Sequence, residues 1–358
     1  MKVVVLYNEP IFTGKKKKST KPKSESLDFD PVFSLEEVDP IEEYKQICNA
    51  LKKFNYEAYT LNIQDDLQLF MRDLEKNKPD VIFNFVELFH DQPRLEMNFT
   101  GLLELLNIPY TGATPNALGT CQNKTLTKRI LDYAGIRTPK FKILKTMNDS
   151  FRTNLRYPLI VKPAWEDASV GIDNNSIVNN VTTLKKRVEY VFSSFKQPAL
   201  VEEFILGREL NVAVFGYKDP KVLPISEIDF SELPDNLHPI VSFQAKWDPM
   251  HEAYHKTIPI CPAPLNKKIQ KQAEKMAIIC FKTMGCRDYA RVDMRLSKED
   301  NKLYVLEVNP NPDLTEDAGF MRSSSHAGYD YATTLKMIVD YAYERKTDKE
   351  KIIEGDKK

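Results

Sequence analysis

The hydrophobic pattern of the first third of the chain predicts a parallel α/β domain. Residues 2–7 form a short apolar, β-branched run, as expected for a strand that is buried on both faces. A helical pattern with its apolar positions on one face follows over residues 40–54. Two further strands and a helix are expected at residues 57–61, 79–86 and 95–106. This alternation places an N-terminal α/β domain at residues 1–114.

After that domain the pattern changes from alternating elements to a strand-rich one. A helix from Lys124 to Ala134 ends at Gly135, a residue type that commonly terminates helices. Strands are expected at 159–164, 176–180, 199–205, 209–216, 222–230, 289–296 and 303–310, and helices at 182–195 and 267–284. We divide this part into a central lobe, a C-terminal lobe and a polar tail, at residues 115–205, 206–345 and 346–358. The predicted fold class is α/β with α+β lobes.

Composition and charge argue against two classes of main partner. The 358 residues include 51 basic and 51 acidic side chains, and this net charge of zero argues against nucleic acid or a membrane surface as the main partner. The five cysteines are scattered, which indicates reduced thiols, and no apolar run reaches the length of a membrane span. The first residues become polar too quickly for a signal peptide. We therefore expect a soluble, cytoplasmic protein.

A lysine-rich stretch at residues 15–26 interrupts the first domain. It contains no apolar residue to bury, so we interpret it as a flexible surface insertion. A contact with polyphosphate or nucleic acid is the alternative interpretation of this segment.

The last two predicted strands form a hairpin with one chemically reactive face. The turn between them is centred near Asp300, so Asp293 is expected opposite Glu307 and Arg291 opposite Asn309. Because side chains alternate along a strand, these four residues share one face of the sheet. The opposite, apolar face is assigned to Ala290, Val292, Met294, Leu306 and Val308.

Two opposed carboxylates repel each other unless a positive charge lies between them. A magnesium ion suits this position, because it takes oxygen ligands and shares its coordination shell with substrate phosphates. Arg291 beside the ion could stabilise negative charge on a reacting oxygen. The alternative is a structural one, in which Arg291 only pairs with the acids in a salt-bridged sheet.

Further charged positions indicate a phosphate-binding site. Lys162 interrupts an apolar strand, where an ammonium group is costly unless it meets an anion. A loop of small residues ending at Gly171 follows it, and Lys124 at the start of its helix could reach the same anion. Glu209 follows a strand and a turn, where a carboxylate could bind a ribose. An ordinary hairpin is the alternative there.

The segment HEAYH, with His251 and His255, matches the H-E-x-x-H pattern of zinc peptidases. That pattern needs a helix, yet Pro249 and Pro259 enclose the segment, and no third ligand is evident. We favour an exposed polar loop and keep the zinc peptidase as a remote alternative.

These pieces, in this order, resemble the ATP-grasp superfamily, and most closely the D-alanine:D-alanine ligase family. The resemblance extends from about Pro79 to Arg345 through LLELLNIPYTG, NKTLTKRILDYAGIRTP, YPLIVKPAWEDASVGI, LVEEFILGREL, FQAKW, ICPAPL and YARVDMRL with VLEVNPNP. It implies an ATP-grasp fold, in which an N-terminal α/β domain is followed by two lobes whose antiparallel sheets enclose ATP. It also places HEAYH in a loop that closes over the active site.

Carried over position by position, the resemblance implies roles for three groups of residues. Contacts with ATP are implied for Lys124, Lys162, Glu202, Phe204, Ile205, Glu209 and Lys246. Magnesium ligands are implied for Asp293, Glu307 and Asn309. Catalytic roles are implied for Arg291 on the acyl-phosphate and tetrahedral oxygens, Lys246 on the transferred phosphate, and Ser169 in the loop that covers the phosphates.

The chain departs from the family pattern around the substrates. Ala168 replaces a serine, Trp247 a tyrosine and Asp313 a glycine, and Ala318 stands where a serine binds the second substrate's carboxylate. A glutamate-containing turn after the first strand and a His-Gly turn are also missing. We therefore expect a rebuilt substrate pocket, with contacts from Ala168, Trp247, Asn311 and Asp313.

The predicted function is an ATP-dependent carboxylate-amine ligase. The expected cofactors are ATP and two Mg²⁺ ions, with Mn²⁺ as an alternative ion, and the expected partners are a small carboxylate and a small amine. The family resemblance also allows a homodimer. A nucleotide-binding regulatory protein without turnover is the alternative.

Overall fold

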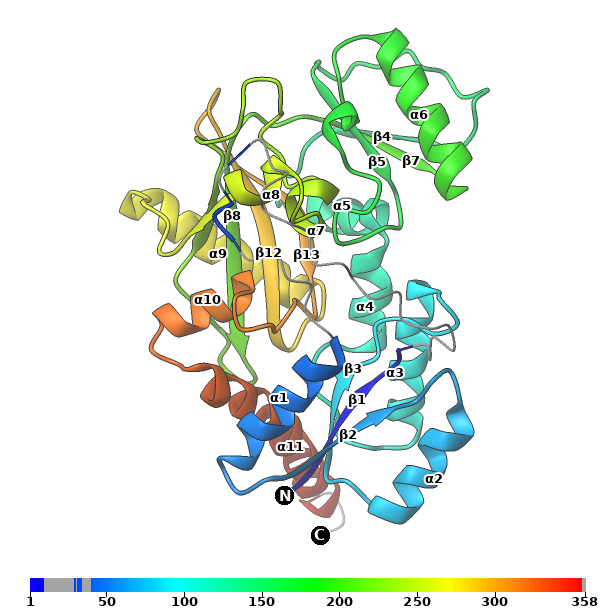
Figure 1. The fold of residues 1–358 in the computed structure, drawn as a ribbon, viewed down its shortest axis with the longest axis vertical. Helices are drawn as coiled ribbons and strands as arrows, with labels where there is room; N and C mark the ends of the chain where they lie inside the picture. Colours follow the sequence, from blue (N-terminus) through cyan, green and yellow to red (C-terminus); the bar gives the residue numbers. More distant parts are fainter. Residues whose placement is uncertain (10–28, 30, 34–39, 356–358) are drawn as a thin grey trace.

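The computed structural model describes residues 1–9, 29, 31–33 and 40–355. Three sheets organise this part of the chain, and each falls within one of the three segments predicted from the sequence (Figure 1). The lysine-rich stretch at 15–26 lies outside the described residues. The segment boundaries themselves stay predictions.

The N-terminal sheet is parallel, with strand β1 at its centre. Its strands are β1 (Lys2–Tyr7), β2 (Glu57–Asn62) and β3 (Val81–Phe85), in the order β2-β1-β3. The helices of this domain are α1 (Pro40–Lys52), α2 (Leu67–Asn77) and α3 (Glu96–Leu105), with a 3₁₀ turn η2 at Pro93–Leu95. Val3 and Val5 pack toward α1, whereas Val4 and Leu6 pack toward α2 and α3. Strand β1 is thus buried on both faces, as its apolar run predicts.

The central lobe is a small antiparallel sheet covered by one long helix. Its elements are α4 (Pro115–Gln122), α5 (Lys124–Tyr133), β4 (Phe141–Leu144), β5 (Leu159–Pro163), η3 (Asn174–Ser176), β6 (Ile177–Val178), α6 (Val181–Phe195) and β7 (Ala199–Glu203). The strand order is β4-β7-β5-β6. Leu184, Val188 and Val191 of α6 recur at helical spacing and pack on the sheet. Gly135 ends the α5 region with φ +74°, as predicted.

The C-terminal lobe holds the largest sheet. Its elements are β8 (Gly207–Gly216), β9 (Lys221–Val222), β10 (Ser226–Asp229), α7 (Phe243–Trp247), α8 (Glu252–Lys256), β11 (Ile258–Ile260), α9 (Lys267–Thr283), β12 (Asp288–Ser297), β13 (Leu303–Asn309), α10 (Gly319–His326) and α11 (Tyr331–Gly355). The order is β11-β10-β8-β12-β13, with β9 beside β8. Helix α9 packs on one face through Ala273, Ala277 and Cys280.

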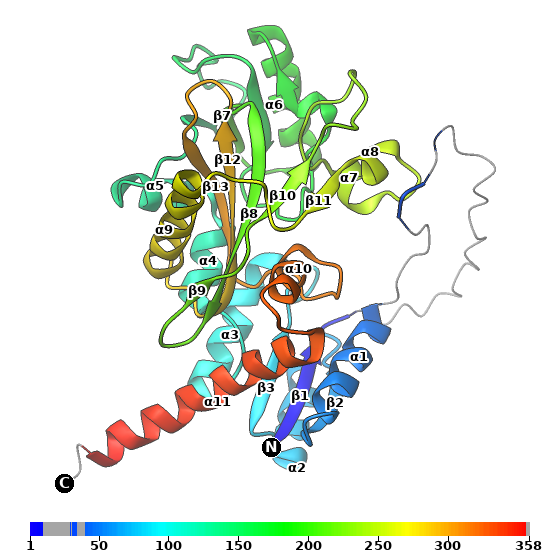
Figure 2. The ribbon, with the colours of Figure 1, turned by 90° about the vertical axis from the view of Figure 1, so that its left-hand side faces the viewer.

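Helix α11 returns the chain to the N-terminal domain (Figure 2). Its residues Leu335, Ile338 and Val339 share one core with Val3 and Val5 of β1. The N-terminal domain is therefore packed against the C-terminal lobe by buried apolar contacts rather than joined by a free linker. The predicted polar tail begins inside α11, which continues to Gly355.

The apolar face of the β12/β13 hairpin requires one correction. A register shift between Asp293 and Met294 places Val305 opposite Met294. Val305 is fully buried in the core, whereas Leu306 is not part of that core, so the prediction for Leu306 was wrong. A bulge adds one residue to a strand and changes which side chains face the core beyond it, and no sequence signal marks it here.

Candidate active site

Strands β12 and β13 carry the acidic face that the sequence predicts. Their antiparallel register places Asp293 opposite Glu307 and Arg291 opposite Asn309. On its other side β12 pairs with β8, where Asn211 lies opposite Asp293. The predicted pairing is confirmed, and Asn211 is an additional member that sequence reasoning missed.

Asp293 accepts hydrogen bonds from three neighbouring side chains. Arg291 donates from Nε at 2.7 Å and from a terminal nitrogen at 2.9 Å. Asn211 and Asn309 each donate from the amide nitrogen at 2.8 Å. Burial by itself would lower the pKa of Arg291, but the charge and hydrogen bonds of Asp293 raise it. The guanidinium therefore stays charged beside the acids.

Lys124 connects this acidic face with the central lobe. Its ammonium nitrogen lies 2.9 Å from Glu307 Oε2 and 2.9 Å from Asp167 Oδ1. Asn123 caps the helix that Lys124 opens by accepting a hydrogen bond from the Leu126 amide, which fixes the lysine at the helix start. Burial is the largest single effect and would raise the pKa of Glu307, but the charges of Lys124, Lys162 and Arg291 together lower it. The pair is ionised at neutral pH.

Glu202 on β7 lies between two buried lysines. Lys162 on β5 is 2.6 Å from one carboxylate oxygen, and Lys128 on α5 pairs with the other. Burial would raise the pKa of Glu202, but the two ammonium groups lower it. Lys162 thus meets an anion, as its place in an apolar strand requires, and that anion is a side chain of the protein. Lys128 was missed, although it lies one helical turn after Lys124.

Glu209 and the segment after β7 surround the guanidinium of Arg295. Arg295 donates to Glu209 Oε2 at 2.7 Å and to the Ile205 carbonyl at 3.4 Å. Its guanidinium carbon lies 5.1 Å from the centre of the Phe204 ring. Three of the residues predicted to contact the adenosine, Phe204, Ile205 and Glu209, therefore lie around an arginine of β12 that sequence reasoning did not single out.

Two loops meet over this site, one from each lobe. Ser169 Oγ donates to the Val241 carbonyl at 2.8 Å, and the Phe243 amide donates to the Ile172 carbonyl at 2.7 Å. Trp247 donates from its indole nitrogen to the Ala168 carbonyl at 2.8 Å. The lobes are thus connected through loops as well as through Lys124.

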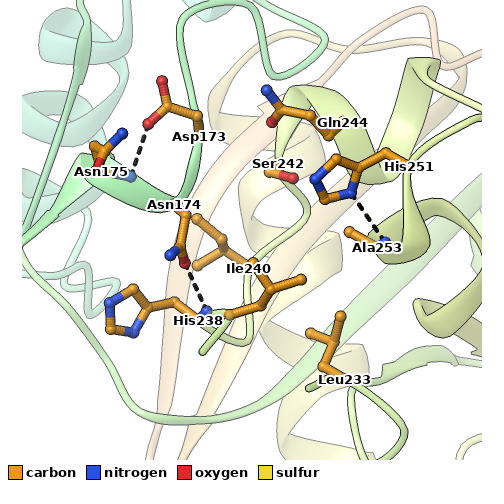
Figure 3. Close-up of a pocket in the computed structure, with 11 residues that line it drawn as sticks. Asp173, Asn174, Asn175, Leu233, His238, Ile240, Ser242, Gln244, His251 and Ala253 are labelled. Carbon is orange, nitrogen blue, oxygen red and sulfur yellow. Dashed lines mark hydrogen bonds between the residues drawn. The ribbon is translucent and has the colours of Figure 1, made fainter. Parts of the chain in front are cut away.

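A small cavity of about 210 Å³ lies along the same seam (Figure 3). The Asn174 side chain donates to the Asn236 carbonyl at 2.9 Å and accepts from the His238 amide at 2.8 Å. Ser242, Gln244 and His251 line the cavity from the C-terminal lobe. These contacts extend the loop-to-loop connection away from the acidic face.

Helix α7 brings Lys246 toward the acidic face. Burial, followed by the nearby Arg291 charge, lowers the pKa of Lys246, whereas Asp313 and Glu307 oppose the shift. The ammonium lies 4.9 Å from the centre of the Trp247 ring, within the range of a cation–π contact. The charges of Arg291 and Glu307 therefore both act on the Lys246 ammonium.

Comparison with known proteins agrees with this geometry. The family described as D-ala D-ala ligase C-terminus matches residues 124–340. A D-alanine–D-alanine ligase of Syntrophotalea carbinolica is 32% identical over 84% of this chain and 90% of its own length. The uncharacterized protein y4sG of Sinorhizobium fredii is 32% identical over 74% of this chain and 75% of its own length. The solved structure of D-alanine–D-alanine ligase from Bacillus anthracis complexed with ATP has a TM-score of 0.69 at 25% identity, covering 98% of this chain and 99% of that one.

The chain belongs to the D-alanine–D-alanine ligase family. It has the ATP-grasp fold of that family, with the N-terminal sheet parallel and the two following sheets antiparallel. The predicted family and fold class are confirmed. In the described part of the chain no helix is both long and apolar enough to cross a membrane.

The donors on β12 and β13 fit the divalent cation that this family uses with ATP. Asp293 and Glu307 offer carboxylate oxygens, the ligands that magnesium prefers. Asn309 uses its amide nitrogen on Asp293, which leaves the amide oxygen to face a cation. Across the described residues no cluster of three or more His, Cys, Asp or Glu side chains could hold a metal, so the Asn309 amide is needed to complete this set.

The zinc-peptidase alternative is excluded by how the two histidines are used. Nδ1 of His255 accepts hydrogen bonds from the Val32 and Phe33 amides, each at 3.0 Å, while Nε2 lies 2.9 Å from the Pro249 carbonyl. His255 is fully buried, so the predicted exposed loop was wrong at this residue. His251 caps α8 by accepting from the Ala253 amide. Packing against Phe29 and Phe33, which are remote in sequence, makes the difference.

The predicted substrate residues take different positions in this family member. Asn311 Oδ1 accepts from the Ala113 amide at 2.9 Å, and it lies against Gly112, where an added Cβ would stand 2.4 Å from it. Gly112 has φ +84°, so both the conformation and the close approach require glycine. Asp313 is exposed, and its charge acts on Arg291 and Lys246. Asn311 positions a turn, whereas Asp313 influences the site through its charge.

Sequence reasoning missed two glutamates whose charges interact. Glu87 follows β3, and burial together with the Asp313 charge raises its pKa to about 7. Burial and then the Glu87 charge raise the pKa of Glu96 well above its usual value. An acid at the carboxyl end of a parallel strand was the available signal, because ligands bind at that edge of a sheet.

Proposed function

We propose that this protein is an ATP-dependent carboxylate-amine ligase that forms an amide or peptide bond through an acyl phosphate. The observation that carries the proposal is the convergence of Lys124, Glu307 and Asp293 between the two antiparallel sheets. Carboxylate oxygens that can bind a cation lie there beside a lysine that can bind phosphate oxygens. The strands need no rearrangement to bring them together. Such preorganised charge is the main source of catalysis in phosphoryl transfer.

ATP binding involves charged side chains that pair with one another in this structure. We assign the phosphates to Lys124 and Lys162, the adenine to Glu202, Phe204 and Ile205, and the ribose to Glu209. Lys124 and Arg295 are already oriented by their carboxylate partners, which reduces the entropy lost on binding. Magnesium, held by Asp293, Glu307 and Asn309, supplies neutralisation of the phosphate charge.

The reaction has two steps. A carboxylate oxygen of the first substrate attacks the γ-phosphorus of ATP, and the bond to the β-phosphate oxygen breaks to release ADP. The amine nitrogen of the second substrate then attacks the acyl carbon, phosphate leaves with the electron pair of the broken C–O bond, and the nitrogen loses a proton to give the amide. Lys246 holds the transferred phosphoryl group, and Arg291 holds the oxygen that becomes negative.

We also propose that the substrates differ from two D-alanine molecules. Trp247 and Ala168 still connect the two loops. The connection is a hydrogen bond from the indole nitrogen to a backbone carbonyl, rather than one between side-chain hydroxyls. Asp313 adds a negative charge where the family pattern has glycine. Ser169 orders the loop over the phosphates through Val241. A homodimer is part of the proposal and is tested by sedimentation.

The test is release of ADP with pairs of amino acids, both enantiomers included, at saturating ATP and magnesium. Turnover that needs both a carboxylate and an amine supports the ligase, and mass spectrometry identifies the amide. Glu307→Gln serves as the blank. ATP binding without turnover over the whole panel would replace the ligase by a nucleotide-binding regulatory protein.

A further inference from the structure

His255 has no part in the proposed reaction, yet its side chain is completely buried. Its imidazole packs against residues more than 220 positions earlier in the chain. The Phe29 ring centre lies 5.3 Å from that of the imidazole, and the Phe33 ring stacks on it at 6.1 Å and 20°. Helix α8 of the C-terminal lobe is therefore in contact with the segment that precedes α1 (Figure 2).

The hydrogen bonds of His255 determine which ring nitrogen carries the proton. Nδ1 accepts from the backbone amides of Val32 and Phe33, each at 3.0 Å, so this nitrogen has no hydrogen of its own. The neutral ring then carries its proton on Nε2, which lies 2.9 Å from the Pro249 carbonyl and donates to it. One imidazole thus bonds to two separate segments of the chain.

Pro249 belongs to the turn that joins α7 to α8. The Asp248 amide ends α7 by donating to a carbonyl of that helix at 3.2 Å. Lys246 and Trp247 occupy the last two positions of α7, directly before this turn. The contact between His255 and the Pro249 carbonyl therefore holds the end of α7 that carries Lys246.

The same short helix is also bonded to the central lobe. The Phe243 amide donates to the Ile172 carbonyl at 2.7 Å, and the Trp247 indole donates to the Ala168 carbonyl at 2.8 Å. Lys246 thus lies on a segment with two attachments, one to the loop of the central lobe and one through His255. Such supporting contacts fix the orientation of a reactive side chain.

We propose that His255 is a positioning residue for the ligase reaction. By joining Val32 and Phe33 to the turn after α7, it holds Lys246 in place for the transferred phosphoryl group. The kinetic consequence rests on the proposed function, whereas the position of α7 is measured without turnover. The HEAYH segment then serves to attach α8 to the segment that precedes α1.

Substitutions at His255 test the two ring nitrogens. His255→Leu removes both partners and should lower kcat for ADP release by about tenfold or more, because small displacements of a reacting group are costly. KM for ATP should change little, since Lys246 acts on the group in transfer. His255→Asn places an amide oxygen near the position of Nδ1, so it keeps an acceptor for the two amides and should recover part of kcat.

Val32 tests the contact from the other side. Its side chain is 59% exposed, so Val32→Ala keeps the bonding amide and is the matched control with wild-type behaviour expected. Val32→Pro removes the amide hydrogen and should lower kcat in the same direction as His255→Leu. Because Val32→Pro retains the buried imidazole, it remains informative if His255→Leu does not fold.

Trp247 reports the position of α7 without turnover. The chain has two tryptophans, so Trp165→Phe leaves Trp247 as the sole indole. In this background we expect His255→Leu and Val32→Pro to increase acrylamide quenching of Trp247 fluorescence. They should also weaken its response to a non-hydrolysable ATP analogue with magnesium. A purely structural role would lower the melting temperature and leave quenching of the folded protein unchanged.

The outcomes separate this inference from the proposed function. Wild-type quenching in both His255→Leu and Val32→Pro overturns the positioning role. Altered quenching in His255→Leu alone overturns the part assigned to residues 32 and 33. Altered quenching with unchanged kcat shows that Lys246 does not depend on His255 and overturns the kinetic role. Altered quenching in a protein that turns over no substrate pair supports the attachment of α7 and overturns the ligase.

Discussion

The two sides of the active site balance their charges differently. On the nucleotide side, Lys124, Lys162, Arg291 and Arg295 each lie within hydrogen-bonding distance of a carboxylate of the protein. On the acceptor side, at the carboxyl end of β3, burial and then the Asp313 charge raise the pKa of Glu87, and the Lys246 charge opposes this shift. The cations of the nucleotide side are paired within the protein, whereas among the described residues no salt bridge joins Glu87 to a basic side chain.

This difference indicates where the family is constrained and where it varies. Phosphates and magnesium are common to every member that uses ATP, so their binding groups can be fixed in advance by salt bridges. Substrate recognition depends on a few residues on loops and strand ends, which change without affecting the core. Asp313, on the loop after β13, is such a residue.

The largest expected effect is at Asp293 and Glu307, the pair proposed to bind the metal. Glu307→Gln removes one of these two carboxylates and leaves Lys124 with Asp167 alone. We expect ADP release to fall by about a thousandfold or more, as is typical when a charged group that acts in the transition state is lost. Steady-state kinetics with Glu316→Gln as control measure it. Activity retained in Glu307→Gln would contradict the role proposed for this carboxylate.

A smaller but still large effect is expected on stability at Glu202. Glu202→Gln leaves the buried Lys128 and Lys162 without their anion, which is expected to cost roughly 3–5 kcal/mol of unfolding free energy. Urea denaturation at pH 7 measures this cost. Glu299→Gln breaks an exposed pair with Arg156 and should change stability by less than about 1 kcal/mol. If both variants lowered the unfolding free energy equally, the charges of the nucleotide side would not depend on Glu202 for their balance.

Trp247 tests the connection between the lobes. Trp247→Phe keeps a ring for the Lys246 ammonium but removes the donor to the Ala168 carbonyl. The loss of one hydrogen bond should raise KM for ATP up to about tenfold, with a smaller change in kcat. Trp247→Ala, which removes both contacts, should also lower kcat. If both variants behave alike, the indole donor has no role in closing the loops.

The smallest effect is a pH dependence on the acceptor side. The pKa of Glu87 is raised to about 7 by burial and by Asp313, Glu9 and Asp167, against Lys246. Because the folded pKa exceeds the unfolded value near 4.5, the folded state binds more protons in this window. This contribution to stability is present below about pH 4.5 and is lost as the pH rises through about 7.

Glu87→Gln should therefore flatten the decline of melting temperature between pH 4.5 and 7. Thermal melts at matched ionic strength detect this change. An unchanged slope in Glu87→Gln would show that Glu87 ionises as freely as a surface carboxylate.

Much of the reaction centre follows from the sequence because its geometry is local. A short turn near Asp300 sets the register of a hairpin, and the alternation of side chains then places Arg291, Asp293, Glu307 and Asn309 on one face. The buried β1 strand and the glycine-terminated α5 region follow from equally local patterns. The bulge that places Val305 rather than Leu306 in the core is a local feature that no sequence pattern predicts.

Contacts between distant segments were decided only by the tertiary structure. Lys124 and Glu307 are 183 positions apart, and residues 32 and 33 reach His255 across more than 220 positions. The sequence by itself determined which side chains carry charge and which face of each strand they share. Docking of the lobes and the N-terminal domain decided which of these charges meet. That choice depends on packing of whole apolar surfaces, which no short stretch of residues encodes.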